Sequence, residues 1–295
     1  VIPLSMASFA ACLMNSGVSK SGSPALMLMT LIPDALISIA FDEIAIVADG
    51  FIFFSRSDIG FFILWNLYIL DGYKSVVMNG PSSNFIIIVA RTSGKQLEEK
   101  GLTLFLLDPS LEGVSLRNYS NVDGSKASEV TLESVTVSSS TMLGKEGEAY
   151  NSLEEVIDLA TLAISAEAIG IMEKMNEITL EYTKTREQFG ETLSSFQALQ
   201  HRMVDTFMAY EQTKSLLLMC AAKLTDKTED ASKSVSALKY QVGIAAKHVG
   251  EESVQLHGGM GVTDETNIGH YFKRLTTIRA IFGNTDYHLK RYSDL

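Results

Sequence analysis

The segment Gln255–Val262 reads QLHGGMGV, and it decides how the second half of the chain is organised. Apolar residues recur at helical spacing from Val235 to Leu256, and the pair Gly258-Gly259 stops that pattern. Three glycines within positions 258–261 leave the backbone bare, so another backbone or a flat ligand can approach it closely. The alternative is that Gly258-Gly259 only cap the preceding helix.

Three more helical patterns accompany this one. The first covers residues 150–184, and the last runs from Ile268 to Phe282. The second begins at Ser194-Ser195, where Ser194 and Gln197 have the spacing of a capping box. Four helices with short connections predict an antiparallel four-helix bundle over residues 149–295.

Residues 70–148 show the periodicity of strands instead. Asp71-Gly72 and Asp123-Gly124 are dipeptides typical of tight turns. Phe85–Val89 is a continuous apolar run, and apolar residues alternate in 102–106 and again in 130–137. The predicted fold class is therefore α+β, with a β-barrel-like middle domain followed by the helical bundle.

The first 69 residues differ in composition from the rest, because charged side chains are sparse there. Pro24, Pro33 and Asp34 interrupt the one stretch long enough to span a membrane, which favours a buried layer over a spanning helix. Attachment to a membrane through this region stays as an alternative. Residues 1–69 are predicted to be an atypical N-terminal region that is divergent, truncated or mistranslated.

Charge and metal-ligand content exclude several function classes. Lys and Arg total 24 against 35 Asp and Glu, a formal net charge of −11, which argues against nucleic-acid binding. Two cysteines cannot form a disulfide framework, and the five histidines show no metal-ligand spacing. We therefore predict no metal site.

A second segment, Arg186–Gly190, reads REQFG and lies at the corner between the first two helices. An arginine at such a corner can bind a phosphate, and the N-terminal amides of the next helix favour an anion. That helix opens with FQALQH at residues 196–201. The alternative is that Arg186 is a surface cation and Gly190 a helix cap.

Taken together, RxxFG, FQxLQH and QLHGGMGV occur in the order found in the C-terminal domain of acyl-CoA dehydrogenases, which this chain resembles over residues 70–295. The runs 166–170, 270–275 and 282–289 are most similar to the small subunits of heteromeric pimeloyl-CoA and steroid side-chain acyl-CoA dehydrogenases.

The resemblance implies an FAD flavoprotein that removes the α and β hydrogens of an acyl-CoA. It implies contacts to the flavin of a neighbouring subunit, and a homo-oligomer or a paired acyl-CoA dehydrogenase subunit as partner. It also implies electron-transfer flavoprotein as electron acceptor and a bacterial-type cytoplasmic location. The implied cofactor-binding residues are Arg186, Phe189, Phe196, Gln197, Gln255, Leu256, His257, Gly258, Gly259, Thr285 and Asp286.

The chain departs from this family at the catalytic base. The family's glutamate corresponds to Gly283 here, or at its alternative position to Ala160, and neither residue can take a proton. Glu167, two turns further along the same helix, is the remaining candidate. A partner subunit that supplies the base explains this departure. The alternative is a non-catalytic relative that keeps only the assembly bundle.

Overall fold

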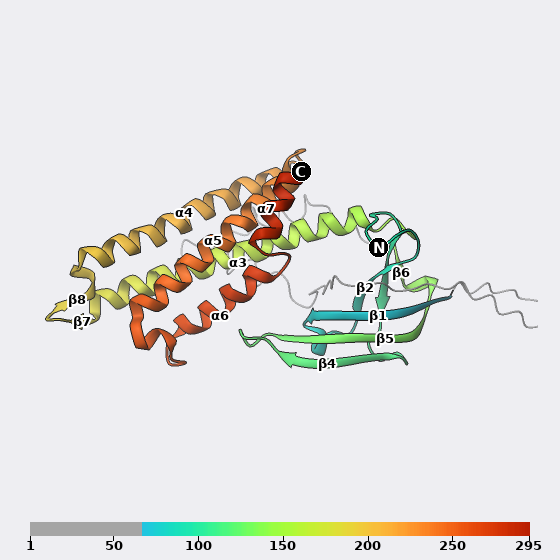
Figure 1. Cartoon of the computed structure of the whole chain (residues 1–295), viewed down its shortest axis with the longest axis horizontal. Helices are drawn as coiled ribbons and strands as arrows, with labels where there is room; N and C mark the ends of the chain where they lie inside the picture. Colours follow the sequence, from blue (N-terminus) through green and yellow to red (C-terminus); the bar gives the residue numbers. More distant parts are fainter. Residues whose placement is uncertain (1–66) are drawn as a thin grey trace, which may run out of the picture. The chain divides into compact units, whose positions relative to one another are not determined.

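The computed structural model describes residues 67–295, which form a β-rich unit up to Glu155 and a helical unit from Val156 onward (Figure 1). The predictions for residues 1–66 lie outside the described residues. Within the described part of the chain, no helix is long and apolar enough to cross a membrane.

The β-rich unit consists of two three-stranded antiparallel sheets. One has the order β1-β5-β4, with bounds Leu67–Met78, Lys126–Ser138 and Val114–Ser120. The other has the order β2-β3-β6, with bounds Ile86–Arg91, Leu102–Leu107 and Met142–Leu143. Single 3-10 turns lie at Gly80–Ser82 and Ser139–Thr141. Apolar residues from both sheets pack into one core around Phe105 and Leu70, which confirms the predicted β-rich middle domain.

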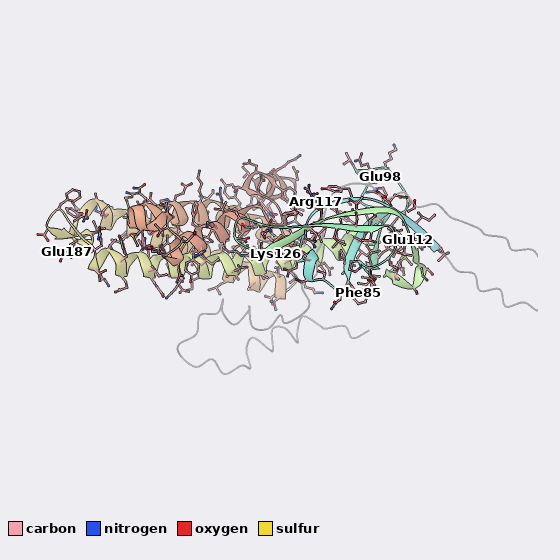
Figure 2. The ribbon with its side chains drawn as sticks, turned by 90° about the horizontal axis from the view of Figure 1, so that it is seen from below. Phe85, Glu98, Glu112, Arg117, Lys126 and Glu187 are labelled. Carbon is pink, nitrogen blue, oxygen red and sulfur yellow. The ribbon has the colours of Figure 1, made fainter. Side chains whose placement is uncertain are left out.

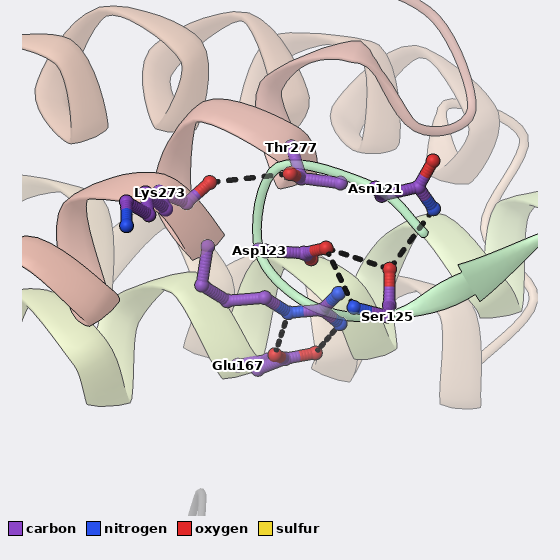
Figure 3. A network of polar contacts seen from close by, with 7 residues as sticks. Asn121, Asp123, Ser125, Glu167, Lys273 and Thr277 are labelled. Carbon is purple, nitrogen blue, oxygen red and sulfur yellow. Dashed lines mark hydrogen bonds and ion pairs between the residues drawn. The ribbon is translucent and has the colours of Figure 1, made fainter. Parts of the chain in front are cut away.

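The two Asp-Gly dipeptides have different structures. Asp123-Gly124 is the predicted turn between β4 and β5, where the Asp123 carboxylate accepts from the Ser125 N–H at 3.0 Å (Figure 3). Asp71-Gly72 is not a turn, so that prediction was wrong. It lies inside β1 at a register shift, where the Asp71 carboxylate accepts from the Ser134 N–H on β5 at 2.6 Å. The register shift leaves the Ser134 N–H without a partner in the ladder between β1 and β5, and the Asp71 carboxylate accepts its hydrogen bond.

The helical unit contains α3 (Tyr150–Thr185), α4 (Gln197–Thr225), α5 (Ala231–His257), α6 (Asn267–Ala280) and α7 (Thr285–Asp294), as Figure 1 shows. A small hairpin of β7 (Glu187–Gln188) and β8 (Glu191–Thr192) joins α3 to α4. Helix α5 supplies the centre of the core, where Val235, Leu238 and Val242 are fully buried. The predicted bundle, the bounds of its first helix and the end of its third helix before Gly258 are confirmed. The third helix begins at Ala231, four residues before the predicted pattern.

Two local predictions for the helices were wrong. Ser194 does not cap α4, because a 3-10 turn at Leu193–Ser195 comes first and makes Phe196 the N-cap residue. The last helical pattern does not continue to Phe282, because α6 ends at Ala280. Phe282 and Gly283 have φ of 56° and 100°, and a separate short helix, α7, follows.

Two buried side chains hold this break between α6 and α7. The Lys239 ammonium, on a side chain only 1% exposed, donates to the carbonyl oxygens of Ile278 at 2.8 Å and Gly283 at 3.2 Å. His288 Nε2 donates to the Phe282 carbonyl oxygen at 2.8 Å. Lys239 and His288 thus donate hydrogen bonds to carbonyl groups that would otherwise be unpaired at the end of α6 and in the turn after it.

Burial gives His288 a pH-dependent contribution to stability. Desolvation, with nearby Lys239 and Arg291, lowers its pKa from 6.5 to about 4. The unfolded chain therefore takes up a proton at a higher pH than the folded chain does, and stability is lost as pH falls from 6.5 to 4. We expect His288→Gln to remove about 2 kcal/mol of the loss between pH 7 and pH 5, measured by urea unfolding. Identical pH slopes in the two proteins would contradict this.

Candidate functional site

The corner that carries Arg186 is tightly closed by backbone hydrogen bonds. The Arg186 N–H donates to the Tyr182 carbonyl at 2.9 Å, and its own carbonyl accepts from Leu193 N–H at 2.8 Å. The guanidinium is exposed, and it has no hydrogen-bond or ion-pair partner among residues 67–295. A fixed backbone with an unengaged cation can bind an anion without first breaking an ion pair.

Aromatic side chains surround this corner at the end of the helical unit, where Figure 2 labels Glu187. Phe189 is at the tip of the hairpin, with a φ of 59° and 93% of its surface exposed. Its ring lies edge-on to that of Phe196 with 6.3 Å between centroids. Gln197, the first residue of α4, is exposed beside Phe196. The structure thus brings Arg186, Phe189, Phe196 and Gln197 together.

Tyr182 connects this corner to the end of α5. Its ring stacks on His257 with 4.3 Å between centroids, and its hydroxyl donates to the His257 carbonyl at 3.3 Å. His257 is 4% exposed and its Nδ1 donates to the Ser253 carbonyl at 2.8 Å, while burial lowers the pKa of the ring. Tyr182 lies one helical turn before Arg186, so the two sequence motifs meet through this side chain.

The residues around His257 offer a ligand different groups. Gln255 is exposed and its side chain can reach a ligand, whereas Leu256 is 6% exposed and packs inward. Beside them is an open groove of about 660 Å³. Its lining includes Ile178, Tyr182, Thr185, His257 and Thr266.

The three glycines of QLHGGMGV lie in different surroundings. Gly258 has a φ of 59° and is the C-cap of α5, as the capping alternative predicted. A Cβ on Gly261 would lie 2.6 Å from the Val254 carbonyl oxygen, so close packing requires that glycine. A Cβ on Gly259 would meet open space, and its φ is not in the left-handed region. A Cβ on Gly258 would also meet open space, so Gly258 and Gly259 together are the bare backbone that a ligand can approach.

The remaining pair of candidates, Thr285 and Asp286, lies at the start of α7 near the middle of α5. A Cβ on Gly243 of α5 would be 2.4 Å from Thr285 Oγ1, so the two helices touch there. Gly243 and His257 are fourteen residues apart on one helix, a separation of roughly 21 Å. The structure therefore divides the predicted cofactor residues of one chain into two groups.

The positions that correspond to the family's base are also clear. A Cβ on Gly283 would lie 2.4 Å from the Tyr287 ring and 3.0 Å from His288 Nε2, so that position is closed to a carboxylate. Ala160 is half-buried on α3. Glu167 forms a two-pronged ion pair with Arg274, with contacts of 2.5 Å to Nε and 2.9 Å to Nη2 (Figure 3).

Two residues that the structure shows to be important in the helical unit were not predicted from the sequence. Tyr182 carried a usable signal, because it lies four positions before Arg186 on the same helical face. Lys239 carried none, since a lysine in an amphipathic helix is normally a solvated residue.

The comparisons with known proteins agree with this geometry. Residues 150–293 match the family model described as acyl-CoA dehydrogenase, C-terminal domain. Over these residues the chain is similar to the C-terminal domain of acyl-CoA dehydrogenases. The family prediction is thereby confirmed for the acyl-CoA dehydrogenase domain, whereas the likeness to small subunits stays a prediction.

Relatives extend the match into the β-rich unit. The 3-(aryl)acrylate reductase of Clostridium sporogenes is 28% identical over 74% of this chain and 58% of its own length. The caffeyl-CoA reductase-Etf complex subunit CarC of Acetobacterium woodii is 26% identical over 70% of this chain and 55% of its own length. Butyryl-CoA dehydrogenase of Megasphaera elsdenii has the same fold, with a TM-score of 0.74 at 23% identity, over 85% of this chain and 62% of its own. The chain spans less than two thirds of the length of each.

The surroundings of Gly261 and Gly259 predict effects of different size for the same substitution at the two positions. Gly261→Ala should lower the free energy of unfolding by about 1–3 kcal/mol, because the new methyl group overlaps the Val254 carbonyl. Gly259→Ala should change it by no more than about 0.5 kcal/mol. Urea unfolding of both variants checks this, and equal destabilisation would be the contrary outcome.

Proposed function

We propose that this chain is a flavin-binding subunit of an acyl-CoA dehydrogenase, acting in the α,β-dehydrogenation of an acyl-CoA thioester. One observation carries the proposal. Within the acyl-CoA dehydrogenase domain, Tyr182 joins the Arg186 corner to the bare Gly259 backbone, and the unengaged cation and exposed Phe189 ring lie at that corner.

These groups fit the phosphate-bearing half of FAD. Arg186 can bind a pyrophosphate, Phe189 and Phe196 offer ring faces to adenine, and Gly259 admits a flat ligand close to the backbone. Gln197 and Gln255 add exposed amides on either side. When bound, FAD would accept the β-hydride, while the protein orients it and excludes water.

The division of candidates into two groups supports a flavin shared between subunits. In this arrangement one chain contributes the Arg186 corner and its neighbour contributes Thr285 and Asp286. Helix α4 supports a partner, because it exposes a large apolar face made of Val204, Phe207, Met208, Leu218 and Met219. Apolar surface of this kind favours a stable interface.

The proposed partner also supplies the base. The closed position of Gly283 and the Arg274 ion pair of Glu167 leave neither ready to take an α-proton. A homologous subunit with a glutamate at the matching position would supply that group. Electron-transfer flavoprotein is the proposed acceptor of the electrons, in line with a relative that is named as part of an Etf complex.

A second candidate function is a non-catalytic relative that keeps the bundle for assembly. The closed Gly283 position favours it. Visible absorbance of the purified chain separates the two, because bound oxidised flavin is yellow and an assembly protein is colourless.

Arg186 provides the sharpest test of cofactor binding. Arg186→Ala should weaken FAD binding about ten- to a hundredfold, because a charge-assisted contact is lost. Lys184→Ala is the matched control, since it removes an exposed cation two residues away that pairs with Glu181. Flavin fluorescence during FAD titration gives both affinities, and circular dichroism checks the helices. Equal FAD affinity in both variants would exclude this role for Arg186.

The isolated chain should not turn over any acyl-CoA. Without a positioned base we expect a rate about 10²–10⁴-fold below that of a complete enzyme. Gly283→Glu should not restore turnover, because φ of 100° and the Tyr287 ring oppose a side chain there. The assay supplies FAD, a panel of acyl-CoA esters and an artificial electron acceptor. Robust turnover by the unmodified chain would show that another carboxylate acts, with Glu167 the first to replace.

A further inference from the structure

A second cavity, of about 380 Å³, is lined by α5, the end of α6 and the start of α7. Three nitrogen-bearing side chains line it: Lys247 and His248 from α5, and Arg279 from the end of α6. Ile244 and Thr285 complete most of its wall. A cationic cavity is notable in a chain whose formal net charge is −11.

Arg279 is the residue that requires an explanation. Its Nε is fully buried without a hydrogen-bond partner, and within residues 67–295 no acidic group pairs with its guanidinium. The residue as a whole is half-buried, but this donor atom is out of reach of water. A donor without an acceptor costs stability, so an acceptor normally completes such a site.

The end of α6 does not provide that acceptor. A cation in the last turn of a helix is favourable when it faces the free carbonyl groups. Here the Lys239 ammonium occupies those of Ile278 and Gly283, and its next contact is the Arg279 carbonyl at 3.5 Å. Capping of the helix therefore explains Lys239 and leaves the Arg279 side chain unexplained.

The acidic residue in the cavity wall compensates little of this charge. Glu251 approaches Lys247 only at 4.0 Å, and both side chains are more than half exposed. Such a pair contributes little energy and opens easily. Apart from His248, the wall has two cations, Lys247 and Arg279, against one carboxylate, Glu251.

We propose that this cavity binds a small organic oxyanion, with Arg279 and Lys247 holding its phosphate or carboxylate group. Arginine can hold two oxygens of such a group at once. The hydroxyl of Thr285 lies in the same wall, and Ile244 contacts the apolar body of the ligand. The phosphate could belong to a separate small molecule or to the proposed flavin, because Thr285 is also a candidate cofactor residue.

Inorganic phosphate, titrated into the full chain by calorimetry and by thermal unfolding, tests the site without any flavin. We expect saturable binding and a rise in Tm beyond that produced by sodium chloride at equal ionic strength. Arg279→Gln should weaken phosphate binding about tenfold, and Lys247→Gln should weaken it severalfold. Lys290→Gln is the matched control, because it removes an exposed cation of α7 that does not line the cavity.

Two results would overturn the proposal: no phosphate-specific rise in Tm, or phosphate affinities in Arg279→Gln and Lys247→Gln equal to that of the control. Should Arg279→Gln fail to fold, Lys247→Gln still decides the question. Repeating the titration in saturating FAD identifies the source of the anion. Where FAD binds, unchanged phosphate affinity indicates a separate small molecule, and competition indicates the phosphate of FAD. Failure of FAD binding leaves the phosphate result intact, so the two proposals can fail independently.

Discussion

The helical unit depends on the placement of one buried ammonium group. Lys239 lies among apolar residues of α5, where burial lowers its pKa from 10.5 to about 8. A lysine so placed is expensive unless its donors are used. Here they bind carbonyl groups on both sides of the break after α6, which fixes the chain reversal at Phe282-Gly283. The reversal sets Thr285 against Gly243, closes position 283 and forms one wall of the cationic cavity.

Much of the fold could be predicted, because periodicity reports burial directly. The patterns over 150–184 and 235–256 correspond to α3 and α5, whose cores bury the predicted residues. The wrong predictions lie where a local sequence signal competes with a contact made elsewhere in the fold. Asp71-Gly72 has the composition of a turn, yet β1 continues through it because Asp71 satisfies the free N–H of Ser134. Ile278 and Phe282 have helical spacing, yet the contacts of Lys239 and His288, distant in sequence, end α6 between them.

The candidate site was less predictable than the fold. The motifs indicated Arg186, Phe189 and Gly259 by type, and the structure adds the contact that joins their segments, the Tyr182 stack on His257. A motif cannot show which glycine is bare. Gly258, Gly259 and Gly261 are equivalent in the sequence, but Gly261 packs against a carbonyl, whereas Gly258, which caps α5, and Gly259 both face open space. A motif also cannot show that the candidate cofactor residues of one chain fall into two groups at different places along α5.

The approach of Gly243 to Thr285 has a consequence for how this sequence can change over time. A methyl group at position 243 would overlap the Thr285 hydroxyl, so a side chain there requires Thr285 to change rotamer or α7 to move away from α5. Residues 243 and 285 are therefore expected to vary together, although they are 42 positions apart in the sequence. Lineages that gain a side chain at 243 should lose one at 285, and this covariation would record the contact between the helices.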